Sequence, residues 1–169
     1  MLVAPVALGW PARAEVGELE LAVKATYLYK LAPFVSWPGG IFSGPEEPLA
    51  ICVQGQDPFG SLLDRAVAGQ RVGTHAIVVR RVARLEHGSD CQIAYVGGSS
   101  TQSTAQALTA TEGAPILTVT DAARGPSKGI VHLVLNGGKV RFSVNAARAE
   151  AGGMGISSKL LALATEVSR

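Results

Sequence analysis

Apolar residues near the start of the chain recur at helical spacing. Over residues 18–35 they are separated by steps of three and four, which places them on one face of a helix. The stripe consists of Ala22, Ala25, Leu28, Ala32 and Val35. Pro33 is expected to kink or end this helix, and the Trp-Pro-Gly-Gly sequence at 37–40 is expected to stop it.

Short apolar or β-branched runs then alternate with helical patterns. Strands are predicted at 49–53, 75–82, 91–96 and 115–119. Helices are predicted at 57–67, 101–110 and 145–151, and a last one follows Ser157. Asp57 suits the N-cap of the second helix, with Pro58 at its first position. The last helix carries an apolar stripe of Leu160, Leu161, Leu163, Ala164 and Val167.

The clearest local signal is a β-hairpin. Residues 130–135 and 139–144 alternate in polarity around Asn136-Gly137-Gly138, and an Asn-Gly turn suits a hairpin because both of its residues take positive φ. Strands that alternate with helices predict a single α/β domain. We expect a largely parallel sheet of about six strands with a C-terminal antiparallel hairpin, flanked by helices.

Composition and charge narrow the class of protein. The chain has 169 residues, enough for one domain of ordinary size. Its net charge of +2 is too small for nucleic-acid binding. The only basic cluster, Arg80, Arg81 and Arg84, lies in a strand-like run and is interpreted as a solvated face. No later run reaches the roughly 18 apolar residues of a membrane span.

The N-terminal segment resembles the end of an export signal. Residues 2–10 read LVAPVALGW, and the small-x-small pattern Ala12-Arg13-Ala14 follows. Residues 1–14 are therefore interpreted as a signal-peptide remnant and residues 15–169 as the domain. The basic region that normally begins such a signal is missing, and a frayed apolar terminus is the alternative.

The two cysteines, Cys52 and Cys91, lie 39 positions apart. There is no C-x-x-C and no histidine near them, which argues against a zinc site. In a cytosolic protein two cysteines are usually free thiols, whereas in an exported protein an even count favours one disulfide. The compartment therefore decides between these two states.

Two loops lie between a strand and a helix, where phosphates are often bound. Residues 55–60 lack the spacing of known phosphate-binding motifs, and Asp57 would repel an anion there. Residues 97–100, Gly-Gly-Ser-Ser, lack the final glycine of a nucleophile elbow. Both are interpreted as helix caps, with binding of a small anion by the amides at 97–100 left open.

The remaining candidates for chemistry are isolated residues. His75, His87 and His132 form no metal-ligand pair and are interpreted as surface or half-buried side chains. Asp121 ends a strand, where catalytic carboxylates often lie, but a capping role is favoured. The sequence therefore predicts no catalytic residue, metal or cofactor, and a binding protein in place of an enzyme.

Five segments together resemble the YfiR family, over about residues 20–167. They are KATYLYKLAPFVSWP at 24–38, LAICVQGQDPFG at 49–60, LTVTD at 117–121, VRFSVN at 140–145 and GISSKLL at 155–161. The chain departs from the family pattern before the hairpin, where Lys128-Gly129 stands in place of paired glycines, so that loop is expected to differ.

The resemblance implies a periplasmic protein that represses an inner-membrane diguanylate cyclase. Such a protein binds the periplasmic sensor domain of the cyclase and lowers cyclic-di-GMP and biofilm formation. It further implies that an OmpA-like, peptidoglycan-binding outer-membrane lipoprotein can sequester the repressor. Cys52 and Cys91 stand where a family disulfide would lie, and the strands that carry them should then be neighbours.

Two other functions stay open. One is a periplasmic small-molecule binding or sensor protein that uses the loops at Gly55 and Gly97, and the other is a small hydrolase with an unrecognised site. The partner-binding residues are unknown from sequence. The hairpin 130–144 and the segment 156–161 are the favoured contact regions because they carry dense family-like sequence. The sequence leaves open whether the chain forms a homodimer.

Overall fold

The computed structural model describes residues 12–169, with side chains from residue 17 onward. The predicted signal remnant, 1–14, lies outside the described residues except for Ala12–Ala14. The backbone of those three residues forms the beginning of the first helix.

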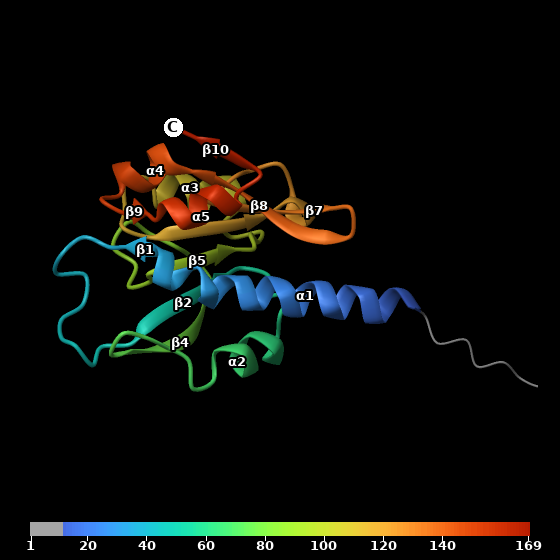
Figure 1. The fold of residues 1–169 in the computed structure, drawn as a ribbon, viewed down its shortest axis with the longest axis horizontal. Helices are drawn as coiled ribbons and strands as arrows, with labels where there is room; N and C mark the ends of the chain where they lie inside the picture. Colours follow the sequence, from blue (N-terminus) through green and yellow to red (C-terminus); the bar gives the residue numbers. More distant parts are fainter. Residues whose placement is uncertain (1–11) are drawn as a thin grey trace, which may run out of the picture.

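An eight-stranded sheet forms the centre of the protein, in the order β10-β8-β7-β6-β5-β2-β4-β3 (Figure 1). Its strands are β2 Leu49–Gln54, β3 Arg71–Val72, β4 His75–Val82, β5 Ile93–Val96, β6 Leu117–Asp121, β7 Val131–Asn136, β8 Lys139–Asn145 and β10 Glu166–Ser168. Five neighbouring strands, β7, β6, β5, β2 and β4, run parallel to one another. Strands β7 and β8 form the antiparallel hairpin. The predicted fold is therefore confirmed: the six expected strands are the six inner ones, and two short edge strands are added.

Among residues 12–169, five α-helices flank the sheet. They are α1 Ala12–Lys30, α2 Ser61–Val67, α3 Thr104–Ala110, α4 Ala146–Ala151 and α5 Ser158–Leu163. Two short 3-10 helices, η1 Ala32–Phe34 and η2 Ala122–Arg124, and a two-stranded sheet of β1 Val35–Ser36 with β9 Gly155–Ile156 complete the fold. The long helix α1 crosses one face of the sheet, and its N-terminal end extends beyond the body of the protein (Figure 1).

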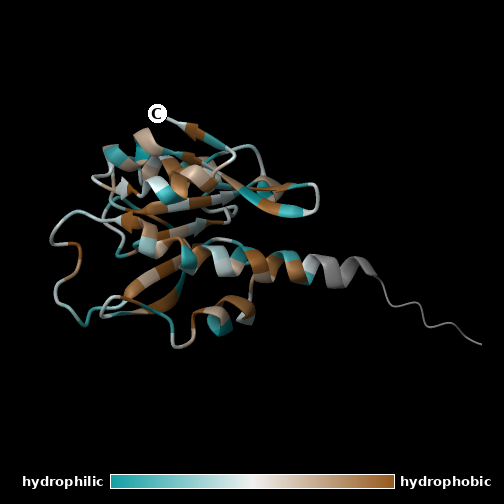
Figure 2. Cartoon of the chain, viewed as in Figure 1, coloured by the Kyte–Doolittle hydropathy of each residue, from teal (hydrophilic) through white to brown (hydrophobic). Residues whose placement is uncertain are grey.

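Alternate residues of the inner strands pack on opposite sides of the sheet. In β2, Ile51 and Val53 belong to the larger core with α1 and α2, whereas Cys52 belongs to a smaller core with α3. Both faces are therefore apolar, as expected for parallel strands covered by helices. Figure 2 shows this concentration of hydrophobic residues in the inner strands and the alternation of hydrophobic and hydrophilic bands along α1.

Helix boundaries differ from the predictions near Pro33 and near Asp57. The first helix was expected to reach residue 35, but α1 ends at Lys30, because Pro33 in η1 has no amide to donate to the preceding turn. The second helix begins at Ser61, not beside Asp57. The Asp57 carboxylate instead accepts bonds from the amides of Phe59 and Gly60, at 2.8 and 3.2 Å, and orders the loop before the helix.

Two predictions near the C-terminus were also wrong in detail. The last helix ends at Leu163, so Val167 belongs to the edge strand β10, where it is half-buried. In the hairpin the two turn residues with positive φ are Gly137 and Gly138, at 59° and 76°, and Asn136 is the last residue of β7. A glycine pair adopts this turn without the steric cost that asparagine would carry.

Candidate functional site

The exposed large hydrophobic side chains of the described residues gather on one side of the protein. Four are exposed: Leu19 by 67%, Val23 by 37%, Leu135 by 53% and Leu163 by 66%. They come from α1, the hairpin and α5, which lie far apart in the sequence. All four line two adjoining hollows of the same surface. Scattered exposed hydrophobic residues are ordinary, but a group that surrounds a groove marks an interaction site.

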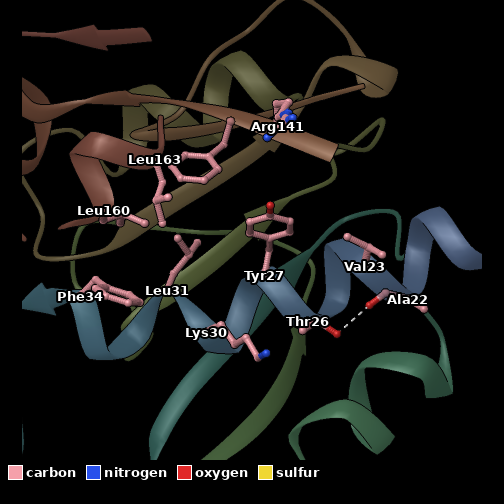
Figure 3. A pocket seen from close by; sticks show the side chains of 11 residues that line it. Ala22, Val23, Thr26, Tyr27, Lys30, Leu31, Phe34, Arg141, Leu160 and Leu163 are labelled. Carbon is pink, nitrogen blue, oxygen red and sulfur yellow. Dashed lines mark hydrogen bonds between the residues drawn. The ribbon is translucent and has the colours of Figure 1, made fainter. Parts of the chain in front are cut away.

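The larger hollow, of about 530 Å³, lies between α1 on one side and β8 and α5 on the other (Figure 3). Its apolar lining includes Leu31, Phe34, Phe142, Leu160 and Leu163. A second hollow of about 360 Å³ extends it toward Leu19 and Leu135 and shares Val23, Tyr27 and Arg141 with it. We refer to the two together as the α1 groove.

Tyr27 fixes the distance between the walls of the α1 groove. Its ring meets Phe142 edge-to-face, with centroids 5.8 Å apart. Its hydroxyl donates a 3.3 Å hydrogen bond to the carbonyl of Val140. Helix α1 is therefore held against β8 at one point, and the groove stays open on both sides of that contact.

The charged side chains around the α1 groove are mainly basic. Lys30, Lys139 and Arg141 line it and form no ion pair with any described residue. Among the described lining residues the one carboxylate, that of Glu20, lies 2.5 Å from the Lys24 ammonium and is engaged there. The groove therefore combines an apolar floor with a positive rim.

A buried polar cluster lies between α1 and the end of β6. Lys24, which is 2% exposed, contacts Asp121 at 2.7 Å. Burial alone would lower the pKa of Lys24, but hydrogen bonds to Asp121 and Glu20 outweigh it and raise that pKa above its ordinary value. Burial, followed by the nearby Asp121 carboxylate, raises the pKa of Tyr95. The Tyr95 hydroxyl makes no hydrogen bond to any described residue.

Asp121 has the capping role that the sequence favoured. One carboxylate oxygen accepts a 2.9 Å bond from the amide of Ala123 at the start of η2, and the other meets Lys24. Both oxygens are thus engaged in holding η2 and α1 to the end of β6. The lysine partner was missed, although its place next to Ala25 and four residues before Leu28 puts it on the inward face of the helix.

The loop at 97–100, at the end of β5, has little capacity to bind an anion. The amide of Gly97 donates to the carbonyl of Gln54, that of Gly98 to the Gln54 side chain, and that of Ser99 to the carbonyl of Gln102. A Cβ added at Gly97 would lie 2.1 Å from the carbonyl oxygen of Gln56, so the adjacent loop fills the space. These three amides are therefore already hydrogen-bonded within the protein and are not available to bind a small anion.

The histidines have structural surroundings. His75 stacks on Phe42 and His87 is exposed, as predicted. His132 is 4% exposed, contrary to the prediction, because it lies on the inner strand β7 beside Thr120. No cluster of potential metal ligands occurs among the residues that the structure describes.

The arginine cluster contacts the protein itself. Arg81 joins Asp57 and Asp64 at 2.8 and 2.6 Å, and so fastens α2 to β4. Arg80 pairs with Asp90. The Arg84 guanidinium donates to the carbonyl of Thr101. The cluster is a solvated face with local partners, as the sequence indicated.

Cys52 and Cys91 form the predicted disulfide, with Cα atoms 5.8 Å apart. Cys52 lies in β2 and Cys91 just before β5, and these two strands are neighbours in the sheet. The bond lies in the smaller core, on the face opposite the α1 groove.

The loop before the hairpin accommodates its departure from the family pattern. The Lys128 side chain is exposed and its carbonyl accepts a 2.8 Å bond from Arg148. Gly129 is buried, and a Cβ there would lie 2.8 Å from the carbonyl oxygen of Thr118. Glycine is thus needed only at the second of the two positions.

Comparison with known proteins places most of the chain in one family. The family described as YfiR/HmsC-like matches residues 21–165. No curated protein is significantly similar in sequence. Among the described residues, no helix combines the length and apolar character that crossing a bilayer would require.

Proposed function

The chain belongs to the YfiR/HmsC-like family, which implies a regulator of cyclic-di-GMP signalling, and we propose that it acts as a periplasmic repressor. In this proposal it binds the periplasmic sensor domain of an inner-membrane diguanylate cyclase. Binding holds the cyclase inactive and lowers cyclic-di-GMP and biofilm formation. The observation that carries the proposal is the gathering of all four large exposed hydrophobic side chains of the described residues around the α1 groove.

A repressor of this kind requires a rigid surface with an apolar centre. Leu19, Leu135 and Leu163 present the exposed apolar side chains that such a centre requires. Burying such side chains at the centre of an interface supplies much of the binding free energy. The basic rim around them favours a partner surface with acidic residues.

Repression requires that the protein distinguish two states of the cyclase. Binding shifts an equilibrium only by the difference in affinity for its two states. Moving a cyclase from almost fully active to almost fully inactive takes about 5.5 kcal/mol of such preference. An apolar groove that fits only one arrangement of the sensor domain is a means of obtaining this preference.

Deletion and complementation test the function in cells. Deleting the gene is expected to raise cyclic-di-GMP, and restoring it is expected to lower the level again. Complementation with Leu163→Glu should fail, because a charge would enter the apolar contact. Ala162→Glu is the matched control: it places the same charge on the preceding residue of α5, which is exposed but does not line the groove. Unchanged cyclic-di-GMP after deletion would refute the proposal.

The periplasmic location has a separate test. The export signal is expected to end near Ala14, so N-terminal sequencing of the periplasmic protein should begin around Glu15. Retention of the apolar segment 2–10 would count against export. Crosslinking in the same preparation would show whether the protein contacts an OmpA-like lipoprotein. It would also show whether two copies of the chain form a homodimer.

A small-molecule sensor is the second candidate, and the groove gives it a location. Ligand sites typically enclose about 300–1,000 Å³ and are mostly apolar, and the larger hollow measures about 530 Å³. A metabolite that raises the melting temperature of the wild type but not of a folded Val23→Trp variant would support this function. Val23 lines the hollow and is 37% exposed, so a larger side chain there would occupy the hollow and not the core.

A further inference from the structure

We infer that the α1 groove recognises an amphipathic helix of the partner whose apolar stripe is flanked by acidic residues. This inference rests on the proposed function and specifies the partner segment that it requires. It combines three properties of the groove: the state of its backbone groups, the placement of its apolar side chains and the sign of its rim.

The backbone beside the groove argues against an added strand. A strand that joins a sheet needs unpaired amides and carbonyls along the edge. The outward carbonyl of Val140 accepts from the Tyr27 hydroxyl, and that of Phe142 accepts from the amide of Thr165 at 2.9 Å. Strand β10 covers the rest of that edge from Ser143 to Asn145. With these carbonyls engaged, recognition through side chains is favoured, which suits a segment whose own backbone is already paired.

The dimensions of the groove suit a helix of about three turns. Helix α1 contributes residues from Leu19 to Lys30, a length of about 17 Å at 1.5 Å per residue. Exposed leucines stand at both ends, with Leu19 and Leu135 at one and Leu163 at the other. A partner helix would place its apolar positions, spaced by three and four residues, between these leucines and over Tyr27 and Phe142.

The rim determines the charge of the partner. Lys30, Lys139 and Arg141 lie along the groove without an ionic partner among the described residues. Glu20, the one carboxylate among the described residues of the lining, is held by Lys24. Acidic side chains beside the apolar stripe of the partner helix would meet these cations, whereas basic ones would be repelled.

The first test reverses the rim. The probe is the purified periplasmic domain of the cyclase whose activity rises on deletion. A triple variant that reverses the rim should weaken this binding about tenfold or more and remove most of its salt dependence. It combines Lys30→Glu, Lys139→Glu and Arg141→Glu.

The matched control changes the net charge equally, on exposed residues outside the lining, and should bind as the wild type does. It combines Lys128→Glu, Lys159→Glu and Arg169→Glu. Thermal melting must show both variants folded, and each single reversal replaces the triple variant if that one unfolds.

The second test reads the structure of the bound segment. A photo-crosslinking amino acid at Val23, on the groove, should attach to partner residues spaced by three and four, with aspartate or glutamate beside them. Attachment at every second residue would indicate an added strand and overturn the inference. Wild-type affinity in the triple rim variant would overturn it too, while leaving the proposed function standing. A cyclase domain that the wild type does not bind at all would overturn both.

Discussion

At the scale of single residues, Lys24 shows where sequence patterns stop being informative. A lysine is almost never fully buried unless it is paired, and its partner Asp121 lies 97 positions away. Periodicity places Lys24 on the inward face of a helix but cannot reveal a partner so distant in sequence. The disulfide, in contrast, could be predicted from the sequence. The chain has only two cysteines, so the pair is fixed once export is assumed.

Removing the ammonium group should destabilise the fold strongly. Lys24→Met leaves the buried Asp121 carboxylate without its counter-ion, a change that typically costs about 3–5 kcal/mol. Lys24→Met with Asp121→Asn should lose less than the sum of the single changes, because no buried charge then remains at that pair. Urea unfolding followed by circular dichroism measures both. A wild-type midpoint for Lys24→Met would show that the pair contributes nothing.

His132 should make the fold sensitive to acid. The Thr120 hydroxyl accepts from the amide of Gly129 at 2.8 Å and forms a hydrogen bond of 2.7 Å with the Nδ1 atom of His132. The His132 side chain is buried on the inner strand β7, where a charged imidazole is poorly solvated. Burial, and then the charge of Lys128, lower the pKa of His132, while Asp121 opposes them weakly.

The folded state therefore binds this proton less readily than the unfolded chain does. Stability from His132 is complete above the ordinary histidine value of 6.5 and is lost as the pH falls below it toward the lowered pKa of the folded state. The urea midpoint should drop between pH 7.5 and pH 5, and His132→Gln should reduce that drop. Equal drops in both proteins would assign the acid sensitivity to other groups.

At the scale of elements, long periodic segments could be predicted and short edges could not. The inner strands carry runs or alternations of apolar and β-branched residues, so their existence follows from the sequence pattern. Strands β3 and β10 have two and three residues of mixed exposure, and they form only because an edge of the sheet is available beside them. Helix α2 began later than predicted because the Asp57 side chain caps the loop amides first.

The hairpin turn gives an element-scale prediction. Gly138 has a φ of 76°, and an added Cβ would meet no atom within 4 Å. Gly138→Ala should therefore cost about 1–2 kcal/mol from the left-handed backbone alone. Asn136→Ala is the control, since Asn136 is exposed and ends a strand with ordinary φ. Equal unfolding midpoints for the two variants would mean that the turn relaxes at no cost.

At the scale of the whole molecule, the groove arises from segments that meet only in the fold. The sequence favoured 130–144 and 156–161 as contact regions, and both contribute lining residues. Helix α1 was not expected to contribute. A second stripe at 19, 23, 27, 30 and 34 was present beside the core stripe, but only the packing of α1 against β8 shows that it faces a hollow and not bulk water.

The placement of the disulfide on the opposite side of the sheet separates stability from recognition. Cys52 and Cys91 lie in the small core against α3, whereas the groove lies on the α1 side. Closing a loop of 39 positions stabilises the fold by about 4 kcal/mol in the chain-entropy model, a large share of the 5–15 kcal/mol typical of a domain. Cys52→Ala with Cys91→Ala should lower the urea midpoint and weaken repression in cells by reducing the folded population. The affinity of the folded variant for the cyclase domain, measured well below its melting temperature, should equal that of the wild type. A changed affinity in a fully folded variant would instead mean that the two faces of the sheet are coupled, and that the disulfide tunes recognition directly.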